Sequence, residues 1–316
     1  MFPIIPANSA ASFPANDEGI FGFGSGSQTA VTNLVSNAGV VSTDVAGVGQ
    51  ARLGLAACEY GGDKGIFGFG IYDGASPNTR CSITNLVSNA GVVATDQAAT
   101  TGTGRNETSA CSYGGDKGIF GFGSTGGGGG NLDATNLVSN AGVVADDVTG
   151  VGTARRLLAA CEFGGDKGIF GYGYDDSAPV VGMTNLVSNA GVVASDTTAV
   201  GSIRYAPGAC GYGDDKGIFA YGNDGCWGCV VSMSNKVSNT GVVADDVTGV
   251  GTARDYIAAC EYGQDKGIFG YGEDAGPSGG GFLAISNLVS NGGVIADDQA
   301  AVTGTARYAL GACSFN

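Results

Sequence analysis

The octapeptide DKGIFGYG occupies residues 166–173 and occurs again at residues 265–272. Close variants begin at four other aspartates: Asp17, Asp63, Asp116 and Asp215. The six copies lie roughly 50 residues apart, a period typical of propellers and solenoids, in which each unit buries its hydrophobic face against the next. The repeat therefore predicts six successive structural units in the 316-residue chain, where length alone would suggest two domains.

One complete unit, residues 154–196, contains four short apolar runs bounded by Gly, Asn or Asp. These runs predict strands at residues 157–163, 168–172, 184–188 and 192–194. Tight turns are expected at residues 164–166 and 189–191, because Gly and Asn tolerate positive φ. Four antiparallel strands repeated around an axis form the blades of a β-propeller. The predicted fold is all-β: a six-bladed β-propeller of four-stranded antiparallel blades.

The second predicted strand suggests how the blades pack. Side chains alternate between the faces of a strand, so Ile169 and Gly171 are expected on one face, and Phe170 and Tyr172 on the other. The aromatic face of one blade would then press on the glycine-bearing face of its neighbour. Equivalent pairs occur in the other units: Phe21/Phe23, Phe67/Phe69, Phe120/Phe122, Phe219/Tyr221 and Phe269/Tyr271.

The two ends of the chain predict how the ring closes. The first unit lacks a good first strand, whereas residues 306–315 (ARYALGACSF) form a first strand with no second strand after it. We therefore expect the C-terminal strand to pair beside the strand that starts at Gly19 and to complete the N-terminal blade. The predicted organisation is an N-terminal arm, residues 1–16, and a propeller, residues 17–316, with repeats starting near 17, 63, 116, 166, 215 and 265.

The arm and the composition bear on partners. Phe2, Ile4 and Ile5 lie in a proline-stiffened segment that is predicted to contact a neighbouring subunit, and folding back on its own propeller is the alternative. A net charge of −15 argues against nucleic-acid partners and anionic membrane surfaces. No apolar run approaches the roughly 20 residues of a membrane span, and the N-terminus lacks the basic region of a signal peptide.

Six of the nine cysteines occupy one equivalent position per repeat: Cys58, Cys111, Cys161, Cys210, Cys260 and Cys313. A disulfide needs Cα atoms within about 7 Å, and a repeating scaffold holds equivalent positions apart. We therefore expect all six to be reduced, buried, small apolar residues. This usage indicates folding in a reducing cytoplasm.

The order of the motifs carries a family resemblance. An Arg, a small apolar strand, a Gly-Gly turn and KGIFGYG together resemble the kelch-type repeat. The phrases NLVSNAGVV and GVGTAR are similar to repeats in virion and tail-associated proteins of aquatic bacteriophages. The resemblance starts at about Asp17 and lacks the Tyr and Trp that punctuate the outer strands of kelch repeats. It implies a propeller and a place in a virion or extracellular assembly.

Charged residues recur at two positions of the repeat. A lysine stands at the first hairpin tip in five units: Lys64, Lys117, Lys167, Lys216 and Lys266. These lysines form either a ring that contacts a partner or solvated turns with local ion pairs. Each connection between units also carries one Asp and one Arg: Asp44/Arg52, Asp96/Arg105, Asp147/Arg155, Asp196/Arg204, Asp246/Arg254 and Asp298/Arg307. A bidentate pair that fixes the connection is the favoured interpretation, and a repeated ligand-binding Arg is the alternative.

Two loops contain motifs that could suggest a cofactor. CWGC at residues 226–229 lacks the second C-x-x-C or the histidines of a zinc site, so we expect a loop disulfide or two free thiols. Trp227 in this loop is a candidate partner contact. GGGGGN at residues 126–131 is expected to be a flexible loop, because no helix or lysine follows it to complete a phosphate site. No metal or cofactor is predicted.

The sequence favours a non-enzymatic function. It has no histidine, which removes the usual general base, and its acids recur with the repeat instead of forming one distinct pair. The loops between GYG and NLVSN vary from 8 to 14 residues, while the opposite turns are nearly identical. The leading hypothesis is a structural protein that assembles with other subunits. The alternative is a lectin-like module that binds a surface glycan through the variable loops.

Overall fold

The computed structural model describes residues 16–73, 79–97, 102–126, 130–178, 180–226, 228–274, 280–299 and 304–316. Within these ranges the chain forms 20 β-strands and no helix, which confirms the predicted all-β class. No helix of the described residues is long and apolar enough to cross a membrane. Four predicted contact residues lie outside the described ranges: Phe2, Ile4, Ile5 and Trp227.

Six antiparallel sheets of three strands each contain all but two of the strands. Their first strands are β3 (Ala56–Tyr60), β8 (Ser109–Tyr113), β11 (Ala159–Phe163), β14 (Gly208–Tyr212), β17 (Ala258–Tyr262) and β20 (Gly311–Phe315). The central, second strands are β4 (Lys64–Gly68), β9 (Lys117–Gly121), β12 (Lys167–Gly171), β15 (Lys216–Ala220), β18 (Lys266–Gly270) and β1 (Glu18–Gly22). The third strands are β7 (Thr84–Val87), β10 (Thr135–Val138), β13 (Thr184–Val187), β16 (Ser234–Val237), β19 (Ser286–Val289) and β2 (Thr32–Val35). A short hairpin of β5 (Ile71–Tyr72) and β6 (Thr79–Arg80) was not predicted.

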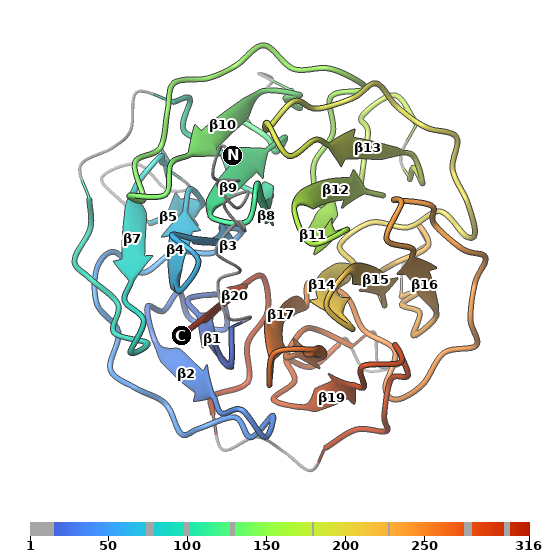
Figure 1. Cartoon of the computed structure of the whole chain (residues 1–316). Helices are drawn as coiled ribbons and strands as arrows, with labels where there is room; N and C mark the ends of the chain where they lie inside the picture. The colour runs from blue at the N-terminus through green and yellow to red at the C-terminus, as the bar shows by residue number, and fades with distance from the viewer. Residues whose placement is uncertain are drawn as a thin grey trace, which may run out of the picture.

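The sheets lie around a common centre, with the first strands innermost (Figure 1). Each first strand contacts the first strands of both neighbouring sheets, and β20 contacts β17 on one side and β3 on the other. β20 also pairs with β1 in antiparallel register, with Cys313 opposite Ile20. The pairing that the sequence predicted for the C-terminal strand is therefore present, and it joins the two ends of the chain in one sheet.

A closed cycle of backbone hydrogen bonds links all six sheets. Its members lie just before the first strands, and each N–H donates to the carbonyl of the next member over 2.7 to 3.1 Å. The cycle runs through Gly54, Ala309, Tyr256, Ala206, Leu157 and Glu107 and returns to Gly54. The step between Gly54 and Ala309 joins the first complete repeat to the C-terminal segment at 2.8 Å, within the range of the other steps.

Twelve buried aromatic rings form the contacts between sheets, as the sequence predicted. They make six edge-to-face pairs across neighbouring sheets, with ring centroids 5.1 to 5.4 Å apart. The glycines of the second strands make room for these rings: a Cβ added to Gly121 would lie 2.8 Å from Phe170 Cζ. The predicted orientation is wrong in one respect, because Phe170 packs on Phe122 of the preceding sheet whereas Tyr172 packs on Phe219 of the following one. The reason is local: β12 ends at Gly171, and Tyr172 has a φ of 64°, which breaks the alternation.

The predicted fourth strand is not a regular strand. In the reference unit it is reduced to a bridge between Val193 and Val187, and a second bridge joins Thr197 to Thr184. Between these bridges the Nδ2 of Asn185 donates to the Ala194 carbonyl over 3.0 Å, where a strand would use a backbone N–H. A buried asparagine side chain thus replaces part of the ladder, and the outermost segment arches away from the sheet. The same arrangement recurs in every sheet.

The six repeat cysteines are buried and unbonded, as predicted. Each is 3 to 5% exposed, and none forms a disulfide. Their sulfurs fill the space left by glycines of the adjacent sheet: a Cβ added to Gly118 would lie 2.5 Å from Cys58 Sγ. Burial raises the pKa of Cys111 well above its usual value, so the reactive thiolate is strongly disfavoured in the folded state.

We expect native protein to protect seven thiols from a thiol reagent, namely the six repeat cysteines and the buried, unbonded Cys81. Burial limits access and suppresses the thiolate, so labelling should require local or global opening. The test compares thiol titration of native and denatured protein without reductant. A difference of about seven groups is the expected result, and rapid labelling of the native protein would contradict the packing described here.

Candidate functional site

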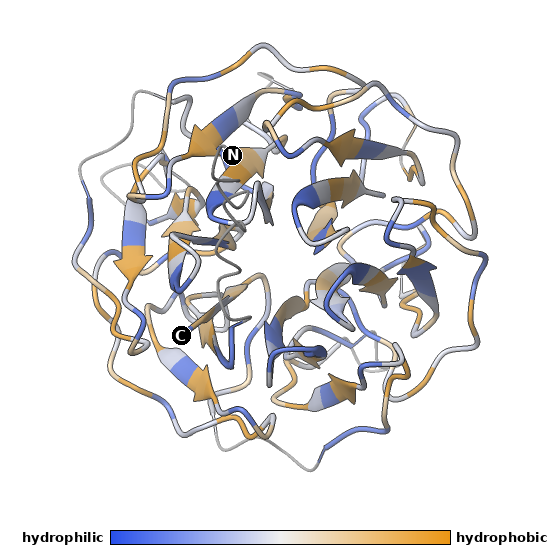
Figure 2. Cartoon of the chain, in the orientation of Figure 1, coloured by the Kyte–Doolittle hydropathy of each residue, from blue (hydrophilic) through white to orange (hydrophobic). Residues whose placement is uncertain are grey.

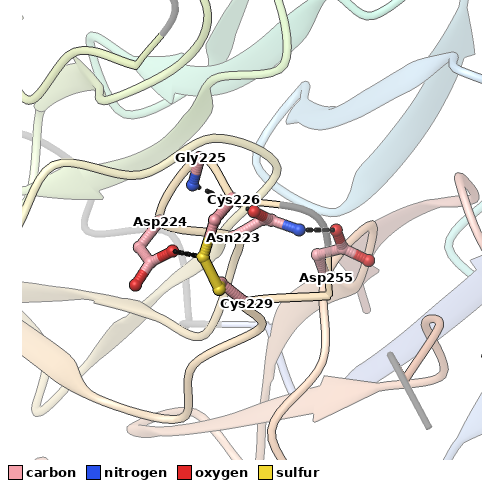
Figure 3. The surroundings of a disulfide bond; sticks show 6 residues. All are labelled: Asn223, Asp224, Gly225, Cys226, Cys229 and Asp255. Atoms are coloured by element: carbon pink, nitrogen blue, oxygen red, sulfur yellow. Dashed lines mark hydrogen bonds between the residues drawn. A yellow bond between two sulfur atoms is a disulfide. The ribbon is translucent and has the colours of Figure 1, made fainter. Parts of the chain in front are cut away.

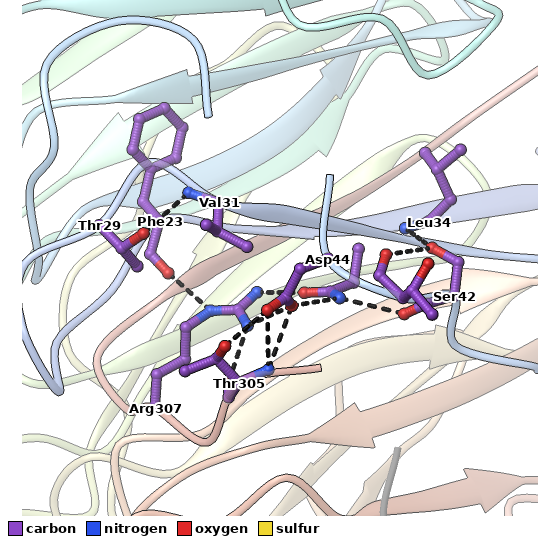
Figure 4. Close-up of polar contacts among 10 residues, drawn as sticks. Phe23, Thr29, Val31, Leu34, Ser42, Asp44, Thr305 and Arg307 are labelled. Atoms are coloured by element: carbon purple, nitrogen blue, oxygen red, sulfur yellow. Dashed lines mark hydrogen bonds and ion pairs between the residues drawn. The ribbon is translucent and has the colours of Figure 1, made fainter. Parts of the chain in front are cut away.

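The six repeat arginines lie in buried polar networks, of which Arg307 belongs to the one that joins the ends of the chain (Figure 4). Arg307 Nη2 donates to Asn33 Oδ1 over 2.6 Å, and its Nε donates to the Phe23 carbonyl over 2.9 Å. The Nδ2 of Asn33 donates to Asp44 Oδ1 over 2.9 Å. Asp44 also accepts hydrogen bonds from the backbone and side chain of Thr305. Residues more than 260 apart in the sequence are thereby held in one network.

The predicted pairing of Asp and Arg within one connection is wrong by one repeat. Each Asp stays with its own sheet, whereas the Arg that follows it enters the next sheet. The observed sets are Arg52–Asn85–Asp96, Arg105–Asn136–Asp147, Arg155–Asn185–Asp196, Arg204–Asn235–Asp246, Arg254–Asn287–Asp298 and Arg307–Asn33–Asp44. Four of these sets contain an Arg–Asp ion pair, in which one Nη1 lies 3.5 to 4.0 Å from one Oδ1. The pairs are not bidentate, because an asparagine lies between the two charged groups.

The arginines also bridge neighbouring sheets. Each guanidinium stacks on an aromatic ring of the preceding sheet, with its Cζ 4.1 to 4.4 Å from the ring centroid. All six side chains are at most 1% exposed, so a ligand cannot reach them in the folded protein. Burial lowers the pKa of Arg155 to about 10, which still leaves it charged at neutral pH. This geometry favours the structural interpretation over a repeated ligand-binding arginine.

The hairpin lysines form local ion pairs. Lys117 Nζ lies 2.7 Å from Asp116 Oδ1, and the same Asp accepts a hydrogen bond from Asn140 at 3.1 Å. Equivalent pairs join Lys64, Lys167, Lys216 and Lys266 to the aspartates that precede them. The Asn–Asp bonds place the first and third hairpin turns side by side on one surface, which we call the uniform face. A role of these half-exposed lysines in partner binding stays a prediction.

The CWGC loop contains a disulfide between Cys226 and Cys229, with Cα atoms 5.2 Å apart (Figure 3). Asp224 Oδ1 lies 3.3 Å from Cys226 Sγ, and Asn223 donates to Asp255 over 3.2 Å. Asp224 and the two cysteines are the only group of three metal-ligand side chains that converge within 4.8 Å in the described part of the chain. The sulfurs are oxidised, and metal ligation requires thiolates, so this loop is not a metal site in its present form.

The variable-loop end of the axis opens into a pocket of about 200 Å³. Leu53, Glu107, Leu157, Tyr256 and Tyr308 are among its lining residues. Three of these, Glu107, Leu157 and Tyr256, have φ between 49° and 55° and belong to the backbone cycle. Such left-handed backbone costs about 1 kcal/mol per residue and concentrates at ligand-binding sites. This left-handed backbone could not be predicted, because the position holds no glycine in five of the six repeats.

Aromatic and acidic side chains surround this pocket. The Tyr308 ring stacks on Phe282 with centroids 4.8 Å apart and meets Tyr256 edge-on at 5.6 Å. Phe282 is 40% exposed. Glu107 Oε2 lies 3.3 Å from Arg156 Nε. The pocket therefore combines aromatic rings with hydrogen-bonding groups, which is the common composition of small-ligand sites.

The opposite end of the axis, on the uniform face, carries a ring of glutamates that our sequence analysis missed. The fourth residue of each first strand lies at the axis, in the order Glu59, Ser112, Glu162, Gly211, Glu261 and Ser314. The signal was present in the alternation of CEY, CSY, CEF, CGY, CEY and CSF. Burial, followed by repulsion from Glu59, raises the pKa of Glu162 to about 7. Burial also raises the pKa of Glu59 and that of Glu261.

These shifts predict that stability falls as the pH rises from about 4.5 to about 7. At a pH between the unfolded and the folded pKa of such a glutamate, the folded state holds the proton and the unfolded state does not. Raising the pH through this range therefore favours the unfolded chain. We expect Glu162→Gln to stabilise the protein by up to about 3 kcal/mol at pH 8 and to change little at pH 4. Urea unfolding at both pH values measures the effect. An equal change at both pH values would contradict it.

No protein-family model matches the chain. A search of curated proteins also finds no match.

Proposed function

We propose that the six sheets are the blades of a closed six-bladed β-propeller that acts as a non-enzymatic structural component of a larger assembly, such as a virion, tail or fibre. Two features support the closed ring: the backbone cycle through all six sheets and the contacts of β20 with both β17 and β3. The resemblance of its repeats to those of phage particle proteins supports the structural role. The absence of histidine from the sequence argues against most acid–base chemistry.

A ring of exposed valines carries the proposal of assembly. One valine per repeat follows the third-strand turn and is 64 or 65% exposed: Val40, Val92, Val143, Val192, Val242 and Val294. Apolar residues are also visible along the outer loops in Figure 2. Burying a valine side chain contributes about 1.5 kcal/mol or more, so a partner that covers several of them gains substantially. A second copy presents the same pattern, so stacking of uniform faces matches valine to valine.

The test replaces the six exposed valines with serine and measures molar mass by sedimentation over a range of concentrations. We expect the native chain to form dimers or larger species and the variant to dissociate. A matched control replaces Val45, Val148 and Val247, which are 45 to 48% exposed but do not occur in every repeat. The same monomeric mass for all three proteins would refute assembly through this face.

Glycan binding at the variable-loop pocket is the second candidate function. The observation that favours it is that Tyr308, which lines the pocket with Glu107, stacks on the exposed Phe282. Flat rings pack against the apolar faces of sugars, and a carboxylate accepts hydrogen bonds from their hydroxyls. A glycan array probed with the native chain and with Phe282→Ala and Tyr308→Ala tests this. Binding that both variants retain, or no binding by the native chain, would exclude this candidate.

A further inference from the structure

The three axial glutamates are arranged by their neighbours in alternate sheets. Glu162 Oε2 accepts a hydrogen bond from Ser112 over 2.7 Å. A Cβ added to Gly211 would lie 1.6 Å from Glu261 Oε1, so the glycine leaves the space that this carboxylate occupies. Ser314 is the small residue beside the third glutamate, Glu59, and its Oγ hydrogen-bonds the backbone of Glu261. Each carboxylate thus extends over a small residue of the preceding sheet, which gives the ring approximate threefold symmetry.

The pocket above this ring is rich in oxygen atoms and poor in available positive charge. It measures about 200 Å³ and is lined by the three glutamates, Ser112, Asn16 and Gln264, among others. The lysines in its lining, Lys117 and Lys216, are paired with Asp116 and Asp215. No hydrogen bond or ion pair joins a lysine or arginine of the described residues to any of the three carboxylates.

Asn16 supplies an independent indication of a missing partner. Asn16 is only 6% exposed, and it lines the same pocket. It lies beside Glu59, and its Oδ1 has no hydrogen-bond partner among the described residues. Buried oxygens without partners are rare in folded proteins and often mark a site for water or an ion.

We propose that this axial pocket binds a hydrated divalent cation. The three glutamate carboxylates do not converge within 4.8 Å of one another, so one bare ion cannot touch all three. A cation that keeps several waters, as Mg²⁺ does, spans the larger distance and offers water hydrogens to the carboxylates and to Asn16 Oδ1. The positive charge offsets the repulsion among three carboxylates that share a confined site.

The test measures thermal unfolding at pH 8 in MgCl₂ or CaCl₂ against NaCl of equal ionic strength, together with calorimetric titration of Mg²⁺. We expect a saturable rise in Tm of several degrees and about one ion per chain. The binding should weaken at least tenfold at pH 5, where protons compete for the carboxylates. The test variant is Glu59→Ser/Glu162→Ser/Glu261→Ser. Serine already occupies the equivalent position in two of the alternate sheets. This variant should lose the rise in Tm with Mg²⁺.

The matched control Asp146→Asn/Asp245→Asn/Asp297→Asn removes three exposed carboxylates at equivalent positions of three repeats. It should respond to Mg²⁺ like the native chain. An equal response from the glutamate variant would show nonspecific screening and overturn the proposal. So would a lack of any response in the native chain, or stabilisation by spermidine but by neither metal.

Discussion

Deletion of residues 306–316 is expected to lower the Tm by more than about 10 °C and to cause aggregation. The deletion removes β20, so β1 loses one of its two strand partners and becomes an open edge. It also removes Arg307, which leaves Asn33 and Asp44 without their buried partner. The measurement is thermal unfolding by circular dichroism with light scattering recorded in parallel.

A peptide of residues 304–316 supplies the control for this deletion. Added in excess, it should restore solubility and part of the lost Tm, because it can pair with β1 as an added strand. A scrambled peptide of the same composition should not. If the truncated chain keeps its native Tm and stays soluble without aggregating, β20 does not complete the structure, and the closed ring is wrong.

Replacing one network arginine with an apolar residue is expected to cost 3 to 5 kcal/mol, roughly. Arg155→Met keeps a similar volume but leaves Asn185 Oδ1 and the Tyr172 carbonyl without their donors. It also removes the cation–π contact with Phe122, at 4.4 Å. The free energy of unfolding in urea at pH 7 measures the loss.

The adjacent Arg156 is a matched control, because it is 30% exposed and makes ion pairs near the surface. Arg156→Met should cost less than about 1 kcal/mol. Arg307→Met should cost as much as Arg155→Met, since the network that joins the chain ends has the same contacts as the others. A much smaller loss for Arg307 would indicate an open seam, and equal losses for Arg155 and Arg156 would contradict the network.

The sequence predicted the features that depend on periodicity. The spacing of DKGIFGYG was sufficient to predict six repeated sheets, because a strand and its turn recur wherever the octapeptide does. The unpaired first strand at residues 306–315 predicted the partnership of β20 with β1. The buried cysteines followed from their equivalent positions. Each of these features follows from the pattern of one repeat, so the sequence of a single unit was enough to predict it in every copy.

Other features could not be predicted because they depend on tertiary neighbours. The φ of 64° at Tyr172 reverses its side chain, and nothing in GIFGYG distinguishes that residue from a regular strand position. Asn185 replaces the fourth strand through its side chain, which no propensity anticipates. The pairing of Asp44 with Arg307 instead of Arg52 requires knowing which strands share a sheet. The glutamate ring becomes visible only when alternate sheets meet at the axis.

Hydrogen exchange in β20 tests the closed ring most directly in the intact chain. If β20 completes the ring, the amides of Gly311–Phe315 that bond to β1 should be protected as strongly as those of the equivalent strand Ala56–Tyr60. Mass spectrometry of exchanged, digested protein reports both segments in one experiment. Similar protection factors are the expected result. Exchange of the C-terminal strand within seconds, while Ala56–Tyr60 stays protected for hours, would contradict the closed six-sheet ring.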